Sequence, residues 1–130
     1  MSDSLWKNKP QPTEQTQMIQ GSRYWTRDSR LKVVAAIPCF NTERSIRDVV
    51  SKAQKHVDQV IVVDDGSHDG TAEAARAAGA LVINHGTNRG YGEAIKSCFE
   101  AARANVAEVL VILDGDGQHK PDEIPKLLAP

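Results

Sequence analysis

Residues 108–119 read EVLVILDGDGQH, an apolar run of strand length that ends in two aspartates one residue apart. A short run of aliphatic and β-branched residues is typical of a buried strand in a parallel sheet. Side chains two positions apart in an extended segment lie on the same side, so Asp114 and Asp116 can both face one cation. The glycine between them leaves room for a turn and for a ligand.

Three similar apolar runs precede this one and are separated by segments with helical features. The expected strands cover residues 31–38 (LKVVAAIP), 59–65 (QVIVVDD), 80–84 and 108–113. Helices are expected from residue 42 to about 57, over 71–78, around 95–102 and after 121, from apolar residues at helical spacing, Ala-rich composition or a Pro start. Strands that alternate with helices predict an α/β protein with a mainly parallel sheet of about four strands. Right-handed crossovers favour the spatial order 3-2-1-4, with flanking helices.

Residues that carry chemistry follow all four expected strands. The strand ends read PCFN (38–41), DDGSHDGT (64–71), NHGTNRG (84–90) and DGDGQH (114–119). In open parallel sheets ligands bind beyond the carboxyl ends of the strands, where the strand order reverses. Four aspartates, Asp64, Asp65, Asp114 and Asp116, are therefore expected at one edge. Because clustered carboxylates repel unless a cation or hydrogen-bond donors compensate them, a divalent metal is the economical explanation.

Asp114, Asp116 and Gln118 are the candidate metal ligands. Their oxygen atoms suit Mg²⁺ or Mn²⁺, with phosphate oxygens and water in the remaining positions. A purely structural acidic turn is the alternative. On the second expected strand, Asp65 is predicted to accept hydrogen bonds from a nucleobase or ribose, as acidic residues do in dinucleotide folds, and Asp69 is predicted to cap the following helix.

Glycines near the third expected strand suggest a phosphate site of an uncommon kind. Neither GxxxxGK[ST] nor GxGxxG occurs, so a P-loop and a dinucleotide fingerprint are both excluded. Gly86, Gly90 and Gly92 form a glycine-rich entry to a helix, with Arg89 and Lys96 nearby, and such an arrangement suits a diphosphate. A flexible loop with solvated charges is the alternative. The histidines at positions 56, 68 and 85 show no ligand spacing.

Composition narrows the class of protein. Sixteen Lys and Arg against seventeen Asp and Glu give a net charge of -1, which lacks the basic excess of nucleic-acid binders. No apolar run approaches the ~20 residues of a membrane helix, and the polar start MSDSLWKNKP lacks the apolar core of a secretory signal. Two cysteines make no disulfide framework and fit a reducing compartment. We therefore expect a cytoplasmic protein that binds no nucleic acid.

Four motifs together resemble a known family. IPCFNTE, VVDDGSHDGT, NRGYGEAI and VLVILDGDGQHKPDEIPKL are similar, in order and spacing, to the N-terminal half of family-2 glycosyltransferases with the Rossmann-like GT-A fold. The style is that of dolichyl- and polyprenyl-phosphate sugar synthases. The resemblance implies a UDP- or GDP-sugar donor, metal-assisted transfer with inversion, and a lipid-phosphate acceptor. It also implies that Pro38, Phe40 and Glu43 border the nucleoside, and that the DxD residues hold metal and diphosphate. Phe40 stands where tyrosine is common.

The resemblance also predicts a division of the chain. Residues 31–130 are expected to be the nucleotide-diphospho-sugar-binding part, with the acceptor site and the general base in a C-terminal part that is absent. Residues 1–30 are expected to be a polar, poorly ordered extension. The strand at 108–113 would then lie at a sheet edge, which predicts self-association, most simply a homodimer. The alternatives are a non-catalytic nucleotide- or metal-binding module of the same fold, or a phospho-acceptor receiver domain, which fits less well because a receiver's acidic pair follows its first strand.

Overall fold

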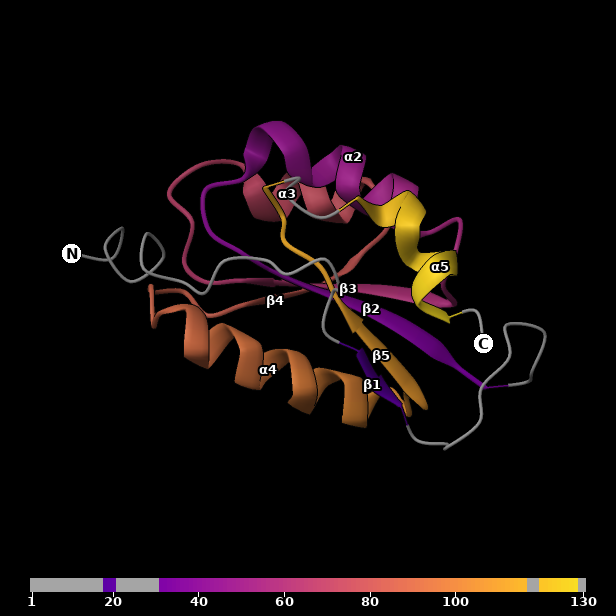
Figure 1. Cartoon of the computed structure of the whole chain (residues 1–130). Coiled ribbons are helices and arrows are strands. Elements are labelled where there is room, and N and C mark those ends of the chain that lie inside the picture. The colour runs from indigo at the N-terminus through magenta and orange to yellow at the C-terminus, as the bar shows by residue number, and fades with distance from the viewer. Residues whose placement is uncertain (1–17, 21–30, 117–119, 129–130) are drawn as a thin grey trace.

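A five-stranded sheet lies between two layers of helices in the computed structural model, which describes residues 18–20, 31–116 and 120–128 (Figure 1). The strands are β1 (Met18–Gln20), β2 (Val33–Cys39), β3 (Gln59–Asp64), β4 (Leu81–Asn84) and β5 (Val109–Ile112). The helices are α2 (Glu43–Ala53), α3 (Thr71–Ala77), α4 (Tyr91–Ala104), the 3-10 turn η1 (Pro121–Glu123) and α5 (Ile124–Leu128). In Figure 1, α2, α3 and α5 cover one face of the sheet and α4 covers the other. Within the described ranges, no helix is long and apolar enough to cross a membrane.

The strand order is β1-β5-β2-β3-β4. The pairs β2–β3, β2–β5 and β3–β4 are all parallel. These four strands confirm the predicted α/β class and the predicted order 3-2-1-4. The chain runs outward from β2 to β4, crosses back through α4 and adds β5 on the other side of β2. The order therefore reverses between β2 and β5, and this is where ligands bind in sheets of this kind.

Strand β1 was not predicted from the sequence. Residues Met18–Gln20 pair with β5 in antiparallel orientation, with Met18 opposite Val111 and Gln20 opposite Val109. The prediction that the strand at 108–113 lies at a sheet edge is therefore wrong, because β1 covers it. The tripeptide MIQ is too short to show any period, and its extended conformation is stabilised by pairing with β5. Among the described residues β4 keeps one unpaired side, and self-association stays a prediction.

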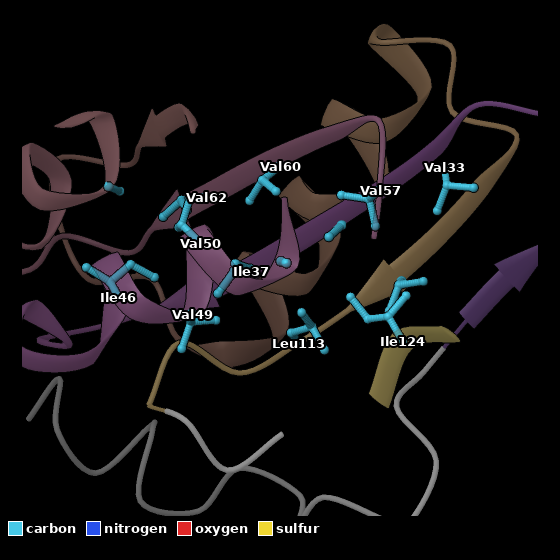
Figure 2. Packing of buried hydrophobic residues seen from close by; sticks show 14 of the residues in the cluster. Val33, Ile37, Ile46, Val49, Val50, Val57, Val60, Val62, Leu113 and Ile124 are labelled. Carbon is cyan, nitrogen blue, oxygen red and sulfur yellow. The ribbon is translucent and has the colours of Figure 1, made fainter. Parts of the chain in front are cut away.

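The core consists of two apolar clusters, one on each face of the sheet. Successive side chains of a strand point to opposite faces, so a continuous apolar run contributes to both clusters. Figure 2 shows the larger cluster, in which Ile37 and Val62 of the sheet lie with Val50 of α2 and Ile124 of α5. The smaller cluster includes Cys98 of α4, which is fully buried. Both layers thus fix the loops at the carboxyl edge of the sheet.

Candidate functional site

The segment after β2 is bonded to the loop after β3. The N–H of Asn41 donates to Ser67 Oγ at 2.8 Å, and the N–H of His68 donates to Asn41 Oδ1 at 2.8 Å. The rings of Phe40 and His68 meet edge to face, with centroids 5.9 Å apart. Pro38 is buried near the end of β2. Phe40, which is predicted to border a nucleoside, therefore lies where the segment after β2 contacts the loop after β3.

Glu43 and Asp69 cross-link the same two loops. The N–H of Glu43 donates to Asp69 Oδ2 at 3.3 Å, and the N–H of Gly70 donates to Glu43 Oε1 at 3.1 Å. Asp69 Oδ1 accepts the N–H of Thr71, the first residue of α3, at 3.0 Å, but the cap position of this helix belongs to Gly70, so Asp69 lies one residue before the position predicted for it. Burial alone would raise the pKa of Asp69, but hydrogen bonds from Thr71 and Glu43 lower it below its usual 3.8.

Asp64, the first of the two aspartates at the end of β3, stabilises its own turn. Its side chain is buried, and Oδ1 accepts both the N–H of Ser67, at 3.0 Å, and the Ser67 hydroxyl, at 2.5 Å. A carboxylate that receives two donors from its own turn needs no cation to compensate it. Asp64 therefore does not support the prediction of a metal from four clustered aspartates.

Asp65, the second aspartate, is fully buried and holds the loop after β4. Its Oδ1 accepts the N–H of Arg89 at 2.9 Å, and its Oδ2 accepts the N–H of Gly90 at 2.8 Å. Its backbone carbonyl accepts the side-chain amide of Asn88 at 3.2 Å. The Gly90 amide that the sequence predicts for a diphosphate is thus bonded to a carboxylate of the same chain. Contact of Asp65 or Gly90 with a nucleotide stays a prediction.

His85 extends this network to α4. Its Nδ1 lies 2.6 Å from Asp65 Oδ1, and its Nε2 lies 2.7 Å from Ser97 Oγ. The His85 side chain is only 5% exposed. His85 has no ligand spacing in the sequence, and no role was predicted for it. A usable signal was present, because His85 directly follows β4 and Asp65 directly follows the neighbouring strand β3, so both had to meet at one edge.

The acidic pair Asp114 and Asp116 lies on the turn that follows β5. Asp114 is buried, with 3% of its surface exposed, whereas Asp116 is exposed. A Cβ added to Gly115 would lie 2.7 Å from Cys39 Cβ, so only glycine allows this turn to pack on the end of β2. The hydroxyl of Ser45 in α2 donates to the Gly115 carbonyl at 2.5 Å. The turn is therefore fixed beside the reversal point between β2 and β5.

Tyr91, the first residue of α4, lies close enough to the acidic turn for the charge of that turn to affect its pKa. Burial first, and then the negative charge of Asp114, raise the pKa of Tyr91 to about 12, with smaller effects from Cys98 and Asp116. The phenol therefore keeps its proton at neutral pH. No role was predicted for this tyrosine from the sequence.

Asp114 and Asp116 fit part of a site for a hard divalent cation. Both supply carboxylate oxygens from one turn, and ions such as Mg²⁺ usually take their remaining ligands from phosphate oxygens and water. Gln118, the third predicted ligand, lies outside the described residues. In the part of the chain that the structure describes, no group of three or more His, Cys, Asp or Glu side chains is placed to hold a metal. A two-carboxylate site completed by a phosphorylated ligand is consistent with this arrangement.

Lys96 lies on the exposed side of α4. It lines a groove of about 440 Å³ together with Gly92, Ile95, Phe99, Glu100 and Arg103. Lys96 and Gly90 were both predicted to contact a diphosphate, but they lie in different surroundings. Lys96 lines the groove on α4, whereas the Gly90 N–H donates to Asp65. A diphosphate contact of Lys96 stays a prediction.

The fold and the site define an α/β protein with an acidic pair at the reversal point of a parallel sheet. The family described as Glycosyl transferase family 2 matches residues 34–130. The match covers most of the chain, so the chain belongs to glycosyltransferase family 2. The family resemblance predicted from the four motifs is confirmed.

Curated relatives are similar in sequence over most of this chain. A UDP-N-acetylglucosamine–dolichyl-phosphate N-acetylglucosaminyltransferase of Methanococcus voltae is 33% identical over 112 residues, covering 72% of this chain and 45% of the relative. An undecaprenyl-phosphate 4-deoxy-4-formamido-L-arabinose transferase of Aeromonas hydrophila is 37% identical over 108 residues, covering 74% of this chain and 32% of the relative. The chain therefore spans less than half the length of these relatives.

Solved structures share the fold, which is of the GT-A type. Glucosyl-3-phosphoglycerate synthase of Mycobacterium tuberculosis, in complex with Mn²⁺, UDP-glucose and phosphoglyceric acid, matches with a TM-score of 0.56 and 27% identity, over 66% of this chain and 33% of that one. Mannosyl-3-phosphoglycerate synthase of Rubrobacter xylanophilus matches with a TM-score of 0.61 at 24% identity, over 72% of this chain and 34% of that one. The second likeness concerns the fold alone.

Proposed function

We propose that this chain binds a nucleotide-diphospho-sugar, UDP- or GDP-linked, together with Mg²⁺ or Mn²⁺, as the donor-binding part of an inverting glycosyltransferase. The observation that carries the proposal is the acidic pair Asp114 and Asp116, fixed beside the reversal point by the close packing of Gly115. The related synthase whose structure contains Mn²⁺ and UDP-glucose supports this choice of ligand.

In this proposal the acidic turn holds the cation, and the loops after β2 and β3 receive the nucleoside. Asp114 and Asp116, with Gln118, would be the protein ligands, and the bound cation would neutralise charge on the leaving diphosphate. Pro38, Phe40 and Glu43 would border the nucleoside. The buried position of Asp114 lowers the local dielectric and so strengthens its attraction for a cation.

The acceptor in this proposal is a polyprenyl or dolichyl phosphate. Its support is the activity of the Methanococcus voltae and Aeromonas hydrophila relatives, a dolichyl-phosphate and an undecaprenyl-phosphate sugar transferase. The general base that activates the acceptor would come from outside residues 31–130. The proposal includes a cytoplasmic location, and the free buried thiols of Cys39 and Cys98 fit a reducing compartment.

Calorimetry tests the donor proposal directly. UDP and GDP are titrated into the chain with and without Mn²⁺, and at least one nucleotide should bind more tightly with the metal. Asp116→Asn should weaken the metal-dependent binding by at least about tenfold, since it removes a ligand charge. Asp48→Asn, on the exposed side of α2, is the matched control and should bind like the wild type. Metal-independent binding that is equal in the Asp116 variant would contradict the proposal.

A further inference from the structure

The side-chain bridge Asp65–His85–Ser97 connects three segments that are distant in the sequence; Asp65 is fully buried, the His85 side chain is nearly so, and Ser97 is partly exposed. Asp65 belongs to the turn after β3, His85 begins the loop after β4, and Ser97 lies in the second turn of α4. The two side-chain contacts are 2.6 Å and 2.7 Å long. Fully buried carboxylates and nearly buried imidazoles are costly unless every polar atom is paired, so this network has to be accounted for physically.

The first function of the network is to hold the loop of residues 86–90. Asp65 accepts two successive backbone N–H groups, those of Arg89 and Gly90, directly before α4. Gly66, the next residue, packs so closely that an added Cβ would lie 2.3 Å from the carbonyl carbon of Thr87. The loop therefore lies directly on the turn after β3. A carboxylate at this position also interacts favourably with the amino end of the α4 dipole.

His85 connects this loop to the body of the helix. Because Nδ1 faces a carboxylate, which only accepts hydrogen bonds, Nδ1 carries a proton and donates to Asp65. Nε2 then accepts the hydroxyl proton of Ser97 when the imidazole is neutral, or donates to Ser97 Oγ when it is charged. A serine hydroxyl can do either, so the bridge persists in both protonation states.

The order serine, histidine, aspartate also occurs in hydrolases, but the position of Ser97 excludes that chemistry. A nucleophilic serine needs nearby backbone N–H groups that are free to stabilise an oxyanion. Ser97 lies inside α4, where the backbone N–H groups around it are committed to the helix. The His85 side chain is also nearly buried, so a substrate has little access to the imidazole. The network therefore positions other groups.

We propose that His85 is a positioning residue, which joins Asp65 to Ser97 and thereby holds the 86–90 loop and the first turn of α4 in the geometry that binds the donor. The proposal rests on the proposed function for its ligand. Its physical basis is that Asp65, to which His85 bonds, accepts the N–H groups of Arg89 and Gly90, the two residues directly before Tyr91 at the start of α4. If the loop is released, Tyr91 and the amino end of α4 move relative to Asp114 and Asp116.

Ser97→Ala is the most conservative test, because it removes only the outer bond of the bridge. Hydrogen exchange of the Arg89 and Gly90 amides, measured by NMR without nucleotide, should become about fivefold to tenfold faster. The amides of Ile37 and Val62 in the core should keep their exchange rates, which separates loop release from global unfolding. Metal-dependent binding of UDP or GDP should weaken by a similar factor.

Two further variants complete the experiment. Ser97→Thr restores the hydroxyl and should return exchange and affinity toward the wild-type values. His56→Asn removes a histidine that pairs with Asp122 at 3.0 Å, and this control should leave both readouts unchanged. Unchanged exchange at Arg89 and Gly90 in Ser97→Ala, or faster exchange with unchanged nucleotide affinity, would overturn the positioning role. If the wild type itself binds no nucleotide, the proposed function fails, and the exchange measurement alone decides whether the bridge holds the loop.

Discussion

At the scale of single residues, four aspartates that look equivalent in the sequence have different roles in the structure. Asp64 and Asp65 receive hydrogen bonds from their own chain and stabilise loops. Asp114 and Asp116 lie on the turn beside the reversal point. The sequence could place all four at one edge, because parallel strands end on one side. It could not assign their partners, because each donor comes from a residue whose position only the folded loops determine.

Gly115 provides a prediction about the acidic turn. Gly115→Ala introduces a Cβ that would lie 2.7 Å from Cys39 Cβ, an atom fixed next to the backbone of β2. Overpacking of this kind typically costs ~1–3 kcal/mol in the free energy of unfolding, and it should also displace Asp114 and Asp116. Urea denaturation and nucleotide calorimetry with Mn²⁺ measure the two effects.

Gly92→Ala is the matched control for that substitution. Nothing lies within 4 Å of a Cβ added at Gly92, and the residue belongs to the first turn of α4. Replacement of a helical glycine by alanine should therefore stabilise the chain by roughly 0.5–1 kcal/mol. Equal changes in the free energy of unfolding of the two variants would show that the packing of the turn on β2 leaves room for a side chain at position 115.

At the scale of elements, the sequence predicts those strands and helices that have an apolar pattern of their own. The strands at 33–39, 59–64, 81–84 and 109–112 lie within or close to the expected ranges, because each contains a continuous apolar run. The first, second and fourth of them are buried along almost their whole length, whereas the strand at 81–84 is partly exposed. The helices follow from apolar spacing and composition. Strand β1 has no such pattern, since three residues contain too little information and only the neighbouring β5 makes them extended. Pairing between distant segments is the part that local patterns do not contain.

The junction between α2 and α3 leads to a prediction about pH. Hydrogen bonds from Thr71 and Glu43 lower the pKa of Asp69, against the effect of burial. A carboxyl group with a lowered folded-state pKa stabilises the fold above its usual value of 3.8, and this contribution is lost as the pH falls through the folded-state pKa. Asp69→Asn should therefore flatten the loss of stability between about pH 5 and pH 2.

Urea midpoints measured across that pH range test the role of Asp69. Asp48→Asn removes an equal charge from an exposed position in α2, together with an exposed ion pair to Lys52, and serves as the control for a surface carboxylate. The Asp69 effect is the difference between the two variants. If both variants show the same pH dependence, the hydrogen bonds at the start of α3 do not stabilise the charged form.

At the scale of the whole molecule, the strand order assembles the site. The reversal between β2 and β5 brings the turn after β5 against the start of α2, where Ser45 bonds to Gly115. The sequence predicted this place from the order 3-2-1-4 and a general rule for parallel sheets. It did not predict the bridge through His85, because that contact depends on how the loop after β4 folds back onto β3. Self-association stays a prediction. It was based on an uncovered edge at β5, and this basis is lost because β1 pairs with β5.

The central claim is that a cation and a nucleoside diphosphate bind at the acidic turn. Paramagnetic broadening of amide signals by Mn²⁺ in the presence of UDP or GDP tests it most directly. The amides of Gly115, Asp116 and Tyr91 should lose intensity first. Those of Leu81 and Val106, which lie at or before the amino ends of β4 and β5, should keep theirs. Asp116→Asn should abolish this pattern. Broadening that is uniform, that begins at Leu81 and Val106, or that is the same in the Asp116 variant would contradict the account.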